Sequence, residues 1–103
     1  MNIQELTKYM NDFVTAKGWY NAESKRPQTL RNLAISLVLE STEVLEQFQW
    51  QESFQDKSEL AEELADVLLY LLQIASIADI NLEEATLAKL DKNYKRNWDG
   101  FHG

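Results

Sequence analysis

Residues that permit tight turns are scarce in this chain, which has three glycines and one proline among 103 residues. A fold of several short strands needs a turn-forming residue every few positions, so this scarcity favours long helices over sheets. Apolar residues recur at helical spacing in four segments. We expect helices over about residues 3–16, 30–49, 59–78 and 81–97. The fold class predicted for residues 1–103 is therefore a single all-α domain, built as a four-helix bundle.

Capping residues mark the predicted helix ends. Gly18 should stop the first helix, and Ser58 is the expected N-cap of the third. Asn81 should cap the fourth, with Glu84 three residues later in the manner of a capping box.

The predicted third helix is apolar on most of its circumference, with aliphatic residues from Leu60 to Ile77. A helix of this kind buries more than one face. Because so small a bundle cannot cover all of them, we expect a homo-oligomer, either a homodimer or a homotetramer.

Charge and composition exclude several classes of function. Ten basic against seventeen acidic residues give a net charge of −7, which argues against nucleic-acid polymers and anionic membranes as partners. The chain has no cysteine, and His102 is its one histidine, so a metal must be held by oxygen atoms. That favours Mg²⁺, with Mn²⁺ as a possible substitute, over Zn²⁺. No signal segment and no membrane-length apolar run are recognised, so a cytoplasmic protein is expected.

Two pairs of carboxylates are the strongest chemical signal. Glu40 and Glu43 share one stripe of the second helix, and Glu63 and Asp66 share one stripe of the third. If these helices pack antiparallel, four carboxylates converge on one cleft and need divalent cations to neutralise them. Such a site suits phosphoryl transfer or pyrophosphate hydrolysis. The alternative is an ordinary solvated acidic face.

Other residues could complete a nucleotide site, each with a structural alternative. Lys89, Asn93 and Arg96 form a stripe on the fourth helix that could hold phosphate oxygens, or could be solvated charges near a helix C-terminus. Tyr70 could donate to a phosphate or be a core tyrosine. The candidates for stacking a base are Trp19 and Trp50, which could equally be packing anchors, and Trp98 is assigned to packing or the tail.

Three segments resemble the signatures of one family. Residues 39–50 and 62–70 resemble the first and second motifs of MazG-like all-α nucleoside triphosphate pyrophosphohydrolases, and residues 89–93 resemble a downstream element. Among the members of this family, the segments resemble those of the dCTP pyrophosphatase type. The resemblance spans about residues 31–96, most of the chain.

The resemblance implies a helical bundle, assembled as a dimer or tetramer, that hydrolyses a nucleoside triphosphate to the monophosphate and pyrophosphate. It implies that the catalytic and Mg²⁺-binding residues are Glu40, Glu43, Glu63 and Asp66. It assigns contacts with phosphate or nucleotide to Tyr70, Lys89 and Asn93, and a base pocket to Trp50 and, more loosely, Trp19. One of the four carboxylates would orient or deprotonate the attacking water; the sequence does not rank them, and Glu43 is taken as the candidate. Arg96 would help Lys89 to hold the leaving pyrophosphate.

One departure affects substrate choice. Relatives have a Trp, then Phe-His, then Pro and a basic-Asn-Leu element in a short loop before the second helix. Here eleven residues separate Trp19 from Arg31, and no histidine lies between them. The substrate could therefore be dCTP, dUTP, a damaged or noncanonical nucleotide, or phosphoribosyl-ATP. A competing hypothesis is a non-catalytic helical module that binds nucleotides or mediates oligomerisation through the same acidic face.

Overall fold

The computed structural model describes residues 1–96, and these form four helices and no strand. The helices are α1 (Ile3–Ala16), α2 (Leu30–Glu46), α3 (Lys57–Ile77) and α4 (Leu82–Lys95). The predicted all-α fold is therefore confirmed. Within this part of the chain, every helix is too short or too polar to cross a membrane.

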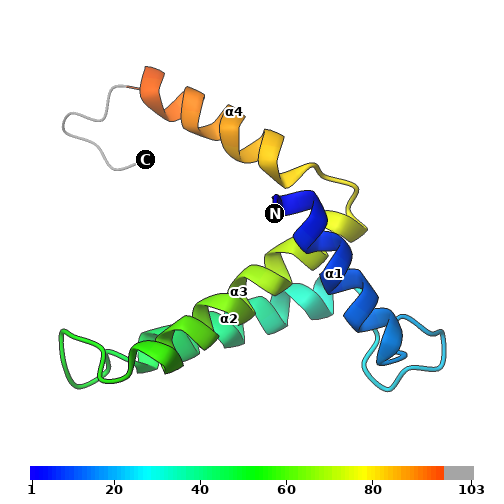
Figure 1. The fold of residues 1–103 in the computed structure, drawn as a ribbon, viewed down its shortest axis with the longest axis horizontal. Coiled ribbons are helices and arrows are strands. Elements are labelled where there is room, and N and C mark those ends of the chain that lie inside the picture. Colours follow the sequence, from blue (N-terminus) through cyan, green and yellow to red (C-terminus); the bar gives the residue numbers. More distant parts are fainter. Residues whose placement is uncertain (97–103) are drawn as a thin grey trace.

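The arrangement is an antiparallel pair with a third helix across it (Figure 1). The most extensive packing is between α2 and α3, and α1 packs against the C-terminal half of α3. After α3 the chain turns, and α4 projects from the junction with little packing against the other helices beyond its first turn, where Leu82 contacts the core. Within one copy, the fourth helix does not lie alongside α2 and α3.

The start of α3 corrects one prediction. Its N-cap is Asp56, not Ser58, and the Asp56 carboxylate accepts hydrogen bonds from the backbone N–H groups of Ser58 and Glu59. The Ser58 hydroxyl donates to the same oxygen at 2.8 Å. A carboxylate is the stronger acceptor and suits the positive end of the helix dipole, so it takes the capping position.

The ends of α2 and α4 also differ from expectation. The α-helical part of α2 ends at Glu46 instead of Gln49, because residues 47–49 form tighter turns through bonds such as Phe48 N–H to Leu45 O. The structure describes α4 as ending at Lys95, and its first turn is capped by Asn81 as predicted. The expected end at Asn97, and Trp98, lie outside the described residues.

Helices α1 and α3 end in the same way. After α1, Gly18 has a φ of +74°, and the Trp19 N–H bonds back to Val14 O. After α3, Asp79 has a φ of +56°, and the Ile80 N–H bonds back to Ala75 O. Both are Schellman motifs, in which a left-handed residue lets the chain reverse while satisfying the last carbonyls. The first places Trp19 against the core.

The core of a single copy is small. Five hydrophobic residues of the described chain are buried: Met10, Val14, Leu33, Leu72 and Ala75. The radius of gyration is 16.4 Å, whereas a compact domain of about 100 residues has about 13 Å. One copy therefore leaves much of its apolar surface uncovered.

Candidate acidic site and adjoining cavity

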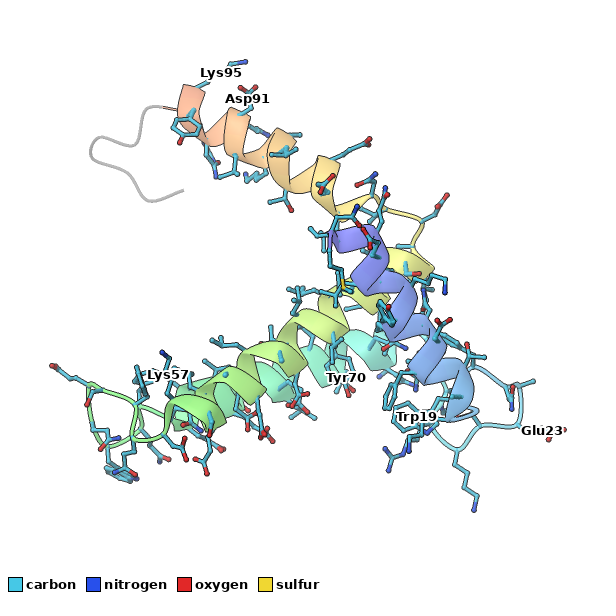
Figure 2. The ribbon with its side chains drawn as sticks, viewed as in Figure 1. Trp19, Glu23, Lys57, Tyr70, Asp91 and Lys95 are labelled. Atoms are coloured by element: carbon cyan, nitrogen blue, oxygen red, sulfur yellow. The ribbon has the colours of Figure 1, made fainter. Side chains whose placement is uncertain are left out.

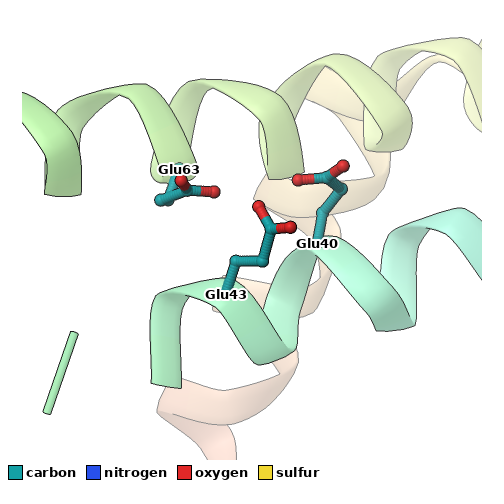
Figure 3. A group of neighbouring side chains, drawn as sticks. All are labelled: Glu40, Glu43 and Glu63. Atoms are coloured by element: carbon teal, nitrogen blue, oxygen red, sulfur yellow. The ribbon is translucent and has the colours of Figure 1, made fainter. Parts of the chain in front are cut away.

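Three of the four predicted carboxylates converge between α2 and α3. Glu40 and Glu43 lie one turn apart on α2, and Glu63 faces them from α3 (Figure 3). One carboxylate oxygen from each lies within 4.8 Å of the other two. The antiparallel pairing of the helices creates this cluster, because it brings two stripes with i, i+3 spacing face to face.

The fourth carboxylate, Asp66, lies beside the cluster. It does not join the tight group of three, and its side chain is exposed. Its charge still acts on both Glu40 and Glu63, raising the pKa of each. The structure thus places all four carboxylates in one electrostatic site.

Crowding of like charges contributes to a raised pKa in two of these carboxyl groups. The pKa of Glu63 is raised to about 7, first by its hydrogen bond with Glu43, then by burial and by the neighbouring negative charges. The pKa of Glu40 is also raised, first by burial and then by the charges of Glu43 and Asp66. Both shifts show that the ionised cluster lacks a compensating positive charge.

Two carboxylate oxygens have no partner. Glu40 Oε2 and Glu63 Oε2 are buried and accept no hydrogen bond within the described residues. Buried carboxylate oxygens without donors are costly unless a cation satisfies them. Together with the all-oxygen donor set, these two atoms fit a hard divalent ion such as Mg²⁺ or Mn²⁺.

A cavity of about 690 Å³ adjoins the acidic site, a volume typical of small-molecule sites. Asp66 and Tyr70 of α3 line the end nearest the carboxylates. Trp19 lines the wall formed at the end of α1, and Figure 2 shows it beyond that helix, with Tyr70 near the middle of α3. The other apolar lining residues are Leu6, Tyr9, Met10, Phe13, Val14, Pro27, Leu33 and Leu69.

Trp19 is fixed by two neighbours. The Phe13 ring meets it edge to face with a centroid separation of 5.6 Å. The Arg26 guanidinium carbon lies 5.4 Å from the centroid of the Trp19 ring. Both interactions hold the indole at the cavity wall, where an aromatic face can receive a planar ligand.

The remaining predicted site residues lie elsewhere in a single copy. Trp50 belongs to the α2–α3 connection, is 89% exposed and does not line the cavity. Lys89, Asn93 and Arg96 are on or next to α4, which projects away from the α2–α3 pair that carries the carboxylates (Figure 1). One copy therefore does not bring these four residues to the acidic site.

Several cavity residues were not among the predicted site residues. Arg26 and Gln28 belong to the non-helical segment before α2, where no periodicity shows which side chains point inward. Gln73 shares the α3 stripe of Asp66 and Tyr70, and that spacing was the available signal.

Comparison with known proteins agrees with this architecture. A family model for the MazG nucleotide pyrophosphohydrolase domain matches residues 28–101. This chain therefore belongs to the MazG nucleotide pyrophosphohydrolase family.

Three individual relatives are 29–38% identical to this chain. The chain is 29% identical to dCTP pyrophosphatase 1 of Bos taurus and 30% identical to that of Homo sapiens, in each case over 91% of this chain and 58% of the relative. It thus spans less than two thirds of these curated relatives. A crystal structure of a pyrophosphatase from Archaeoglobus fulgidus superposes with a TM-score of 0.75 at 38% identity, covering 87% of this chain and 86% of that one.

Proposed function

We propose that this protein is a divalent-metal-dependent pyrophosphohydrolase, which cleaves a nucleoside or deoxynucleoside triphosphate to the monophosphate and pyrophosphate. The observation that carries the proposal is the acidic cluster with its two unpartnered buried oxygens beside a ligand-sized cavity. Family membership and the similarity to dCTP pyrophosphatases support the same reaction. We propose dCTP or a noncanonical nucleotide as the substrate.

In this proposal all four carboxylates are metal ligands, and one of them is also the general base. Glu40, Glu43, Glu63 and Asp66 would hold Mg²⁺, for which Mn²⁺ could substitute. When bound, the metal neutralises the carboxylates and the polyphosphate, and promotes attack by water. Glu43 accepts a proton from the attacking water, whose oxygen bonds to the α-phosphorus as the bond from that phosphorus to the pyrophosphate oxygen breaks. The Tyr70 hydroxyl, at the cavity end nearest the carboxylates, donates to a phosphate oxygen.

The cavity accommodates the nucleoside. Its volume suits one nucleoside, and the Trp19 ring offers an aromatic face on which a base can stack. The triphosphate then lies toward Asp66 and the carboxylates.

We also propose that the active form is a homodimer or homotetramer. Large apolar side chains are exposed on α2, α3 and α4, including Val38, Leu64, Leu87 and Leu90, which are 49–62% exposed. Exposure on this scale in so small a domain marks an interface. A second copy of the chain would bring α4 and the α2–α3 connection, with Lys89, Asn93, Arg96 and Trp50, to the acidic site of the first.

The test is pyrophosphate release from ribo- and deoxynucleoside triphosphates with Mg²⁺, Mn²⁺ or EDTA. We expect metal-dependent release from one or a few nucleotides. Glu63→Gln should lower turnover by at least 100-fold with the helical circular dichroism intact. Glu62→Gln is the matched control, because Glu62 is exposed and lies outside the cluster, and should retain activity. Full activity of Glu63→Gln would refute the site.

A non-catalytic nucleotide-binding module is the second candidate. It is favoured by one observation, namely that Lys89 and Arg96 do not lie at the acidic site within one copy. Such a module would bind the Mg²⁺–nucleotide complex in calorimetry and release no pyrophosphate.

A further inference from the structure

A chain of hydrogen-bonded amides runs along one wall of the cavity. Gln73, which is only 4% exposed, donates through Nε2 to Gln28 Oε1 at 2.6 Å. Gln28 in turn donates through Nε2 to the backbone carbonyl of Arg26, also at 2.6 Å. Gln28 and Gln73 both line the cavity.

The backbone fixes which way both amides point. A carbonyl oxygen can only accept, so the atom of Gln28 that faces Arg26 O must be its NH₂ group. Gln28 then presents its oxygen to Gln73, and Gln73 must donate to that oxygen through its own NH₂ group. Rotating either amide by 180° would break a hydrogen bond, so the orientation is set by chemistry.

Tyr20 lies near Gln73 and belongs to a second series of hydrogen bonds. The Tyr20 hydroxyl donates to Asn11 Oδ1 at 2.6 Å, and Asn11 donates to Ser76 Oγ at 2.9 Å. Burial raises the pKa of Tyr20, and an amide hydrogen bond from Gln73 to its hydroxyl opposes that rise. The Gln73 amide is held by its hydrogen bond to Gln28 Oε1. Its Oε1 accepts no hydrogen bond within residues 1–96, and Gln73 lines the cavity.

The helix sets the distance between this oxygen and the acidic site. Asp66, Tyr70 and Gln73 line the same cavity from one stripe of α3. Seven residues of α-helix separate Asp66 from Gln73, a rise of about 10 Å. This is comparable to the reach of a nucleoside from its phosphate to the far edge of its base.

We propose that Gln73 is a specificity residue, whose fixed carbonyl oxygen selects bases that carry an exocyclic amine over bases with a keto oxygen at the same position. The inference rests on the proposed pyrophosphohydrolase function and goes beyond it by assigning base selection to one atom. An amine of cytosine or adenine donates to Gln73 Oε1. The keto oxygen of uracil or hypoxanthine would leave two acceptors facing each other, which a buried site does not tolerate.

The first test uses the unaltered, full-length protein with Mg²⁺ and two matched pairs of substrates. The pairs are CTP with UTP, and ATP with ITP. The two members of a pair have nearly the same size, and one carries an amine where the other carries a keto oxygen. The deoxy forms are assayed in parallel. We expect kcat/KM for pyrophosphate release to be about tenfold or more higher for the amine member of whichever pair is turned over. Cytidine triphosphate without its exocyclic amine should lose a similar factor.

The second test replaces the amide. In Gln73→Met, which keeps the length of the side chain, the amine-to-keto ratio should fall toward one. The matched control is Gln4→Met, an exposed helical glutamine outside the cavity, and it should keep the wild-type ratio.

The outcomes separate this inference from the proposed function. Metal-dependent release that favours amine bases, with the ratio lost in Gln73→Met, establishes it. Release that is equal or faster with keto bases overturns the role of Gln73 and leaves the pyrophosphohydrolase intact. Absence of release from every nucleotide defeats the proposed function itself. Should Gln73→Met not fold, the wild-type substrate pairs and the amine-free analogue still decide the question.

Discussion

Glu63 differs from an ordinary glutamate in the pH range over which it loses its proton. Its pKa of about 7 arises from the hydrogen bond with Glu43 and from three neighbouring carboxylates. In an unfolded chain the same group titrates near 4.5. Between these values the folded protein binds more protons than the unfolded one, so its free energy of unfolding must fall as pH rises.

We therefore predict that the free energy of unfolding of the metal-free protein falls between pH 4.5 and pH 7. Above pH 7, titration of Glu63 should change it little. Urea unfolding in EDTA, followed by circular dichroism at intervals from pH 5 to pH 8, measures the slope. Glu63→Gln should flatten it, because the amide does not titrate. A wild-type stability that rises steadily over this range would contradict the assignment.

Metal binding should reverse that trend. A bound cation requires ionised carboxylates, so saturation with Mg²⁺ stabilises the folded state most at high pH. We expect the Tm to increase on adding Mg²⁺ at pH 8 and to respond much less at pH 5. Differential scanning calorimetry with Mg²⁺ or EDTA provides the comparison, and Glu63→Gln should show a reduced response at both pH values.

At the level of the helices, the caps make separable contributions. Asp56 satisfies two N–H groups at the start of α3, while Ser58 adds a hydroxyl to the same carboxylate. We predict that Asp56→Ala lowers the free energy of unfolding by about 1 kcal/mol. Ser58→Ala should cost less, because the cap itself remains. Chemical denaturation of both variants would rank them, and a larger loss for Ser58→Ala would restore serine as the cap.

The end of α3 offers a stabilising change. Asp79 adopts a left-handed conformation with a φ of +56°, where glycine carries no steric penalty. Gly18 holds the equivalent position after α1. We predict that Asp79→Gly raises the free energy of unfolding by about 0.5 kcal/mol, since relief of strain exceeds the added entropy of the unfolded chain. Asp79→Ala, which keeps the Cβ atom, is the matched control and should not stabilise.

The helices were predictable to the extent that periodicity and caps determine them. The stripes of Glu40 and Glu63 correctly indicated that these side chains would meet, because helical spacing and a short antiparallel connection fix their faces. Gln28 was not predictable in the same way. Its place in the cavity depends on the irregular segment between α1 and α2, whose path follows from local hydrogen bonds such as the one to Arg26 O.

At the scale of the whole molecule, a single copy leaves large apolar faces uncovered. Its five buried hydrophobic residues are few beside the exposed apolar faces of α2, α3 and α4. The sequence signalled this through the apolar circumference of α3, yet it could not show that α4 projects away from its own bundle. We propose that a second copy of the chain supplies the packing surface for α4.

We predict that Leu90→Glu dissociates the oligomer, or raises the protein concentration at which the oligomer forms. Leu90 lies on the exposed apolar face of α4 with Leu87 and Tyr94. Ala85→Glu introduces the same charge on the opposite side of α4 and serves as the control. Sedimentation velocity over a range of concentrations reads out the mass, and the wild-type Tm should rise with concentration. A wild-type protein that remains monomeric throughout would refute the oligomer.

Helix α3 fixes the distances between several residues of the site. It carries Asp66, Tyr70 and Gln73 along the cavity, with Glu63 one turn before Asp66, and a helix cannot stretch. Inserting one residue between Asp66 and Gln73 would rotate everything beyond it by about 100° and turn the amide away from the ligand. The segment from Lys17 to Thr29 is not an α-helix, so its length does not fix the direction of each side chain in this way. Changes of length in this domain can therefore accumulate before α2, where they reshape the cavity wall, while the span of α3 stays fixed.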